Sequence, residues 1–231
     1  AGLRAITDTN IEDGLRLGKR QLDMAPNRPT ALKIVVLFTD GRPTAFSDYL
    51  RLASGPGGTG TCTPADLTYC NSRSRRPACY DGIAAAYING SSFRGLFRPS
   101  DGAKIIGFTS TCSPIVTRNS SYRGSPAPLR MPDGSSTNGY NIRRLGIEQS
   151  EAWANAIRAA GYTIYAVGLG NPNALYPGDR PDLDFLRRLA NERGIVDPSQ
   201  PMGELMFAPT AADLDAAFSK LADRILTRLT R

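Results

Sequence analysis

The residues of this chain that are best suited to bind a ligand are Asp40 and Thr9. Asp40 follows the apolar run Lys33-Ile34-Val35-Val36-Leu37-Phe38-Thr39 and precedes Gly41. A run of this kind, rich in β-branched residues, predicts a strand buried on both faces, which is typical of parallel sheets covered by helices. Ligands of such sheets bind beyond the carboxyl ends of the strands. A carboxylate there is costly unless it is paired or coordinated, and Mg²⁺ binds such oxygen atoms.

Each of these two residues also has a purely structural interpretation. The dipeptide Asp40-Gly41 favours a turn. Thr9-Asn10-Ile11-Glu12 matches the capping box, in which Thr9 is the N-cap of a helix and Glu12 bonds back to it. The functional alternative is that the Thr9 hydroxyl oxygen lies at the mouth of the sheet, and the spacing alone leaves both alternatives open.

Composition excludes several kinds of site. The chain has no histidine, so Ser-His-Asp and Cys-His catalysis and histidine-containing zinc sites are excluded. No apolar run is long enough to span a membrane. The net charge of +7 indicates either an arginine-rich solvated surface or a preference for anionic partners. The basic residues Arg73, Arg75 and Arg76 have no interleaved aromatic residues, so we expect no nucleic-acid partner.

The elements around Asp40 and Thr9 alternate between helix and strand. Apolar spacing predicts a helix from Ile11 to Leu22, followed by the strand at 33–39. From about residue 146 the predicted order is helix, strand at 162–170, helix, strand at 204–208 and helix. We therefore predict an α/β fold with a Rossmann-like, doubly wound parallel sheet.

The region between these two parts has a different character. Residues 44–145 are rich in Gly, Pro, Ser, Thr and Arg, and we predict an inserted module there, between domain segments 1–43 and 146–231. Ala84-Ala85-Ala86-Tyr87 predicts part of a short helix, and residues 104–108 predict a short strand. All four cysteines, which are Cys62, Cys70, Cys79 and Cys112, lie in this module. Their even number predicts two disulfides and an oxidising compartment, with three possible pairings.

Three stretches together resemble the von Willebrand factor type A family. They are Thr9-Asn10-Ile11-Glu12-Asp13-Gly14-Leu15, Ile34 to Gly41, and Ile164-Tyr165-Ala166-Val167-Gly168-Leu169. The resemblance covers about 1–43 and 146–231, and the last residues, 226–231, are similar to the end of such domains in bacterial Tad-type pilus-associated proteins. It implies a metal-ion-dependent adhesion site for Mg²⁺, or for Mn²⁺ or Ca²⁺, with Thr9 as its threonine and Asp40 as its second aspartate.

One part of the family pattern is missing from the chain. The first strand of the family ends in Asp-x-Ser-x-Ser, which supplies the primary metal ligands, and it precedes the threonine by more than eight residues. Asp133-Gly134-Ser135-Ser136-Thr137 fits these letters, but it follows Met131-Pro132 and predicts a turn. We therefore expect N-terminal strands outside these residues, so that the strand at 33–39 is an open edge. An upstream segment or another chain would then complete the sheet and supply the absent ligands.

The predicted function is metal-dependent adhesion or protein binding in an extracytoplasmic bacterial envelope or pilus-associated protein. The resemblance implies a protein partner whose carboxylate completes the metal's ligands. The alternative is a structural subunit of a surface assembly with a vestigial metal site. An oxygen-liganded metal hydrolase ranks last, because Asp182 and Asp184 lie at a predicted helix start, where the helix dipole accounts for them. We therefore predict that the protein is not an enzyme.

Overall fold

The computed structural model describes most of the chain outside the predicted insertion and part of the insertion itself. The described residues are 9–25, 31–39, 42–53, 70–71, 74–75, 80–89, 92–97, 104–107, 115–118, 139–174 and 180–229. Side chains are described for residues 9–25, 31–39, 42–45, 47, 143–174 and 180–229. No helix in these ranges is both long enough and apolar enough to cross a membrane.

The chain forms two compact units. One unit, Ile11–Arg42 with Ser150–Arg231, is called the parallel unit here, and the other, Ala1–Asn10 with Pro43–Gln149, the antiparallel unit. The helices are α1 Ile11–Met24, α2 Gly139–Ala159, α3 Leu183–Ala190 and α4 Leu214–Leu229, with 3₁₀ helices at Glu192–Gly194 and Ala211–Asp213. The strands are β1 Ile34–Thr39, β2 Ala45–Ala53, β3 Cys70–Asn71, β4 Ser74–Arg75, β5 Tyr80–Asn89, β6 Ser92–Phe97, β7 Lys104–Gly107, β8 Ile115–Arg118, β9 Thr163–Leu169 and β10 Leu205–Ala208.

The parallel unit is built on a three-stranded parallel sheet in the order β1-β9-β10. Strand β9 pairs with β1 from Ile34 opposite Thr163 to Thr39 opposite Gly168, and β10 pairs with its other edge. All residues of β9 except the last are buried. The α/β prediction, with helices alternating with the strands of a parallel sheet, is therefore confirmed for this unit.

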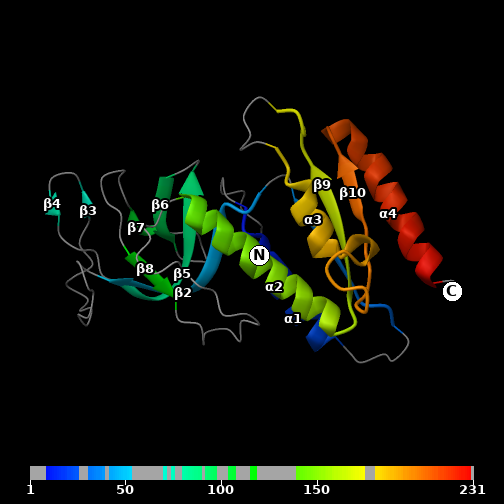
Figure 1. Cartoon of the computed structure of the whole chain (residues 1–231), viewed down its shortest axis with the longest axis horizontal. Helices are drawn as coiled ribbons and strands as arrows, with labels where there is room; N and C mark the ends of the chain where they lie inside the picture. Colours follow the sequence, from blue (N-terminus) through cyan, green and yellow to red (C-terminus); the bar gives the residue numbers. More distant parts are fainter. Residues whose placement is uncertain are drawn as a thin grey trace. The chain divides into compact units, whose positions relative to one another are not determined.

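Helices cover both faces of this sheet. On one face, Leu186 of α3 lies beside Gly168. On the same face α1 packs on β1, since a Cβ added at Gly18 would lie 3.7 Å from the Val35 side chain. Helix α4 covers the other face, where its residues Ala217 and Leu221 join one apolar cluster. The sheet residues of that cluster are Tyr165, Val167, Met206 and Ala208. Figure 1 shows α3 and α4 on opposite sides of β9 and β10.

The expectation that the strand at 33–39 is buried on both faces is wrong for part of β1. Leu37 and Thr39 are buried on the face that carries α1, but Val36 and Phe38 are 44% and 48% exposed on the other face. The reason is that α4 covers mainly β9 and β10. On β1, Ile34 packs against the cluster under α4, and the rings of Phe38 and Phe218 are 6.0 Å apart. Within the described sheet β1 is an edge strand, as predicted.

The antiparallel unit contains a five-stranded antiparallel sheet in the order β7-β6-β5-β2-β8. Its β7 confirms the short strand predicted at 104–108, but the short helix predicted around Ala84–Tyr87 is wrong, because these residues lie in β5. Strand β5 pairs with both β2 and β6, and this tertiary pairing overrides the high intrinsic helix propensity of alanine. The cysteine side chains lie outside the described residues, and the predicted disulfides and the boundaries 44–145 stay predictions.

Polar groups fix the helices to the parallel sheet at its amino edge. Arg158 at the end of α2 is buried and donates to the Leu189 carbonyl of α3 at 2.7 Å and to Gln200 at 2.9 Å. Burial lowers the pKa of Arg158, but a guanidinium remains charged in a protein. Its positive charge therefore lies at the carboxyl end of α3, where the helix dipole favours a cation.

Gly203 is expected to tolerate no side chain. A Cβ at this position would lie 1.7 Å from the carbonyl oxygen of Ile164 in the central strand. Since that atom belongs to the backbone, Gly203→Ala should lower the free energy of unfolding by about 3 kcal/mol or more, measured by urea denaturation. The matched control is Gly14→Ala in α1, where nothing lies within 4 Å of the added Cβ. That variant should gain up to about 1 kcal/mol, and equal effects of the two would contradict the close approach of Gly203 to Ile164.

Glu204 should make stability depend on pH. Its oxygens lie 2.7 Å from Lys220 and 2.8 Å from Arg224. Burial raises the pKa of Glu204, but these two cations outweigh it and hold the pKa below its ordinary value of 4.5. A carboxyl with a lowered folded-state pKa stabilises the fold above its unfolded pKa and loses this effect as the pH falls through the folded value.

Both cations of this group are half exposed, so the effect should be small. Glu204→Gln should lower the free energy of unfolding by about 1 kcal/mol at pH 7, and the difference should shrink below pH 4.5. Urea denaturation at pH 7 and pH 3 measures both, and a difference that is the same at the two pH values would contradict the assignment.

Candidate functional site

The carboxyl ends of the three parallel strands form the candidate site. Strand β1 ends at Thr39, which is buried, and Asp40 is the next residue in the chain. Strands β9 and β10 end at the same edge, where the Gly170 N–H donates to the Ala208 carbonyl at 3.1 Å. Asp40 itself lies outside the described residues, and in the sequence it directly follows Thr39, the last residue of β1.

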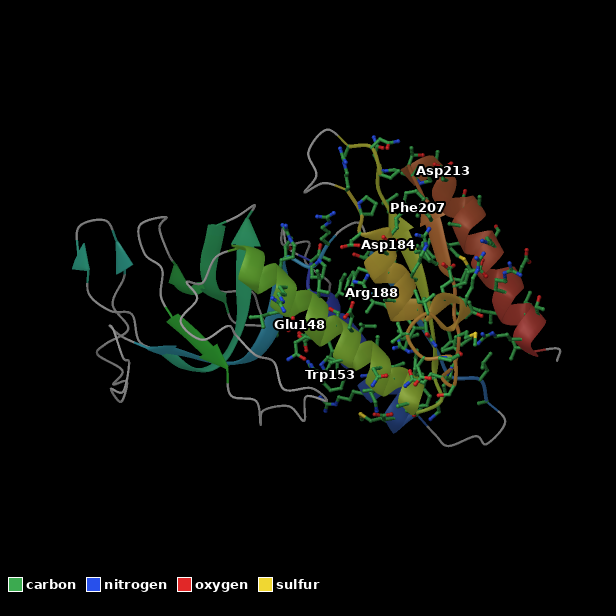
Figure 2. The ribbon with its side chains drawn as sticks, viewed as in Figure 1. Glu148, Trp153, Asp184, Arg188, Phe207 and Asp213 are labelled. Carbon is green, nitrogen blue, oxygen red and sulfur yellow. The ribbon has the colours of Figure 1, made fainter. Side chains whose placement is uncertain are left out.

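The acidic residues that follow β9 and β10 act as helix caps. Asp182 accepts a hydrogen bond from the Phe185 N–H at 3.0 Å and is the N-cap of α3. Asp213 accepts from both the N–H and the hydroxyl of Thr210, and these two residues form a capping box before the last helix. Figure 2 shows Asp213 at the start of the segment that continues into α4. These carboxylates are therefore explained by the fold, and they leave Asp40 as the candidate ligand.

Thr9 lies in the antiparallel unit, where its backbone is fixed against the start of β2. Its N–H donates to the Thr44 hydroxyl at 2.7 Å, and its carbonyl accepts from the N–H groups of Thr44 and Ala45. The next residue, Asn10, donates to the Ser47 hydroxyl at 2.7 Å. Asp40 belongs to the parallel unit and is not described, so the pairing of Thr9 with Asp40 stays a prediction.

The capping box predicted before α1 is replaced by other hydrogen bonds. The helix begins at Ile11, one residue later than a Thr9 cap requires. Glu12 is 2% exposed and accepts from the Trp153 indole N–H at 3.1 Å, and the Thr9 N–H is bonded to Thr44. Figure 2 shows Trp153 on α2, the helix that supplies this donor. A buried ring donor from 141 positions away has thus taken the place of the local backbone bond.

Arg42 was not singled out by the sequence analysis, but it has an unusual environment. It lies two residues beyond Asp40, and its Nε atom is buried without a hydrogen-bond partner among the described residues. A buried donor that lacks a partner costs about 1–3 kcal/mol. The sequence shows that an arginine follows Asp40-Gly41. It contains no pattern from which the burial of the Arg42 Nε atom could be predicted.

The carboxyl edge of the sheet holds no closed metal site among the described residues. In the described ranges, no group of three or more His, Cys, Asp or Glu side chains is arranged to hold a metal ion. Mg²⁺ takes six oxygen ligands and retains several waters, so a single carboxylate with a hydroxyl is a partial site.

Comparisons with known proteins add no assignment. No family model, curated protein or solved structure matches this chain. The resemblance to von Willebrand factor type A domains rests on the three sequence stretches alone.

The buried Glu12 should be more important for stability than its neighbour Asp13. Glu12→Ala removes the acceptor of the Trp153 indole and should lower the free energy of unfolding by about 2 kcal/mol. Asp13→Ala removes an ion pair with Arg16 on the same turn and should cost less than about 1 kcal/mol. Urea denaturation followed by Trp153 fluorescence measures both, and an equal loss would show that the indole bond contributes nothing.

Proposed function

We propose that this protein is a protein-binding domain that holds a divalent cation at the carboxyl edge of its parallel sheet. The observation that carries the proposal is the position of Asp40, directly after the last residue of β1 in a parallel α/β sheet with helices on both faces. Ligands of open α/β sheets bind at this edge, and an aspartate there offers the hard oxygen ligand that Mg²⁺ prefers.

We also propose that the fold is a von Willebrand factor type A-like, doubly wound sheet that lacks its N-terminal strands. A disulfide-stapled insertion follows Asp40-Gly41. Thr9 is proposed as the second ligand of Mg²⁺, or of Mn²⁺ or Ca²⁺, on the strength of the resemblance. The protein would work outside the cytoplasm, in a bacterial envelope or pilus-associated assembly, and not as an enzyme.

One feature favours an acidic protein partner. Most of the net charge of +7 lies in the residues of the antiparallel unit, since acidic and basic residues nearly balance in the parallel unit. An acidic partner would be attracted by this excess positive charge, and its carboxylate would complete the metal's ligands.

The alternative proposal is a structural subunit of a surface assembly with a vestigial metal site. The observation that favours it is that the described carboxylates following β9 and β10 are bonded in helix caps. On this alternative Asp40 is a turn residue, and the edge of the sheet binds no cation.

Calorimetric titration with Mn²⁺ and Mg²⁺ distinguishes these two functions. The protein in its complete, naturally encoded form should bind Mn²⁺ at millimolar concentration or below, and Asp40→Asn should weaken binding at least about tenfold, because the substitution removes the charged ligand. The matched control is Asp184→Asn, since Asp184 is 81% exposed on α3 and pairs with Arg187.

The outcomes separate the proposals. Binding that is lost in the Asp40 variant and kept in the Asp184 variant supports the metal site. Binding that survives Asp40→Asn places the cation elsewhere. Absence of any binding at millimolar concentration favours the structural subunit.

A further inference from the structure

The main chain of Thr9 is held by three hydrogen bonds to two residues at the start of β2. The Thr9 N–H donates to the Thr44 hydroxyl at 2.7 Å. The Thr9 carbonyl accepts from the N–H groups of Thr44 and Ala45, at 3.0 and 3.2 Å. These bonds use the N–H and the carbonyl of Thr9, and none of them uses its hydroxyl. They therefore fix the place of Thr9 in the antiparallel unit without occupying the oxygen atom of its side chain.

Thr44 lies in a segment that is itself firmly packed. Pro43 and Ala45, its two neighbours in the chain, are both buried. Helix α2 packs closely on this segment, since a Cβ added at Gly146 would lie 3.0 Å from the Pro43 Cβ and 3.4 Å from the Ala45 carbonyl oxygen. Thr44 is thus a rigid support for Thr9, because its position is fixed from both sides.

The start of α1 does not use Thr9 as its cap. The helix begins at Ile11, so its N-cap position is Asn10, whose side chain donates to the Ser47 hydroxyl at 2.7 Å. Glu12, the other member of the capping pattern, accepts from another element. The hydrogen bonds made at residues 9 and 10 therefore serve the attachment to residues 44–47 and not the predicted capping box.

Thr44 is also close in sequence to the other proposed ligand of the cation. It follows Asp40 by four residues. The same short segment that leaves Asp40 thus bonds to the main chain of Thr9. A residue so placed is suited to hold a ligand in position, as the residues that orient metal ligands do in known metal sites.

We propose that Thr44 is a positioning residue of the metal site, which acts by holding Thr9 through the hydrogen bond to its N–H. This inference rests on the proposed function, and it adds the start of β2 to the support of that site. The hydroxyl of Thr44 is the group that matters, because it accepts the Thr9 N–H, whereas the Thr44 N–H is present whatever the side chain.

Calorimetric titration of the complete protein with Mn²⁺ tests the role of Thr44. Thr44→Val keeps the shape of the side chain but removes the acceptor, so Mn²⁺ should bind about tenfold more weakly. Thr44→Ser retains a hydroxyl and should restore the wild-type affinity. The matched control is Ser47→Ala, which removes the neighbouring bond from Asn10 and leaves the bonds of Thr9 intact, so its affinity should be that of the wild type.

The variant Thr9→Ala decides whether Thr44 acts through Thr9. Thr44→Val should weaken Mn²⁺ binding about tenfold when Thr9 is present and should have no further effect in the Thr9→Ala protein, because the group that it positions is then absent. An equal loss in the two backgrounds would overturn the proposal, since Thr44 would then act on the fold and not through Thr9.

Amide hydrogen exchange of the metal-free protein gives a measurement that does not depend on the cation. The Thr9 amide should be protected in the wild type and in Thr44→Ser, and it should lose this protection in Thr44→Val while the amides of β9 keep theirs. Equal exchange of the Thr9 amide in the three proteins would overturn the proposal.

The outcomes also separate this inference from the proposed function. A wild-type protein that binds no Mn²⁺ overturns both. If the wild type binds Mn²⁺ and Thr44→Val binds it equally well, the positioning role is wrong and the metal site stands. The same holds if Ser47→Ala loses as much affinity as Thr44→Val.

Discussion

The burial of β9 is the constraint on which the parallel unit depends. Residues Thr163 to Gly168 are all buried, so each edge of the strand needs a paired strand and each face needs a helix. Strands β1 and β10 meet the first demand, and α3 and α4 the second. Gly168 shows how close the packing is, because an added Cβ would lie 3.0 Å from Leu186. Among the described residues, strand β1 has a paired strand on one edge, and its second face is only partly covered by α4.

The fold of the parallel unit was predictable because its signals are local. The apolar run at 33–39, the spacing of Ile11 and Leu15 and the Gly161 stop after α2 each describe one element. At that stop Gly161 has a φ of +82° and donates to Arg158, and Tyr162 donates to Ile157, which closes the helix. The exposure of Val36 and Phe38 was not predictable, since it depends on how far α4 reaches across the sheet.

The antiparallel unit was not predictable in the same way. Its sheet joins strands that are far apart in the chain, such as β2 with β8, and a residue's preference for a strand depends on its neighbours there. Alanines at 84–86 suggest a helix when they are considered alone, yet they lie in β5, where Ala85 pairs with Ser47 on β2 and with Phe97 on β6. Pairing between distant strands of this kind produces no regular spacing of apolar residues that could be recognised in a sequence rich in Gly, Pro and Ser.

For the candidate site, the sequence indicated which residues matter but not which hydrogen bonds they make. Thr9 and Glu12 have the spacing of a capping box. The hydrogen bond from Trp153 to Glu12 was not predictable, because the two residues are far apart in the sequence. Asp182 and Asp213 have similar local patterns and do form caps. A capping pattern is therefore decisive at an exposed helix start and insufficient where a buried donor from another element can reach the carboxylate.

The excess positive charge of this protein is unevenly distributed between its two units. In the parallel unit, polar groups are bonded within the unit: buried Asn191 bonds to Val196 and Asp197, and Glu204 pairs with Lys220 and Arg224. Acidic and basic residues nearly balance there, so this unit has little long-range field. The excess positive charge lies in the antiparallel unit, which the chain inserts directly after Asp40-Gly41 and Arg42. On the proposed function, the attraction of an acidic partner would come mainly from the charge of the antiparallel unit, and salt would weaken it.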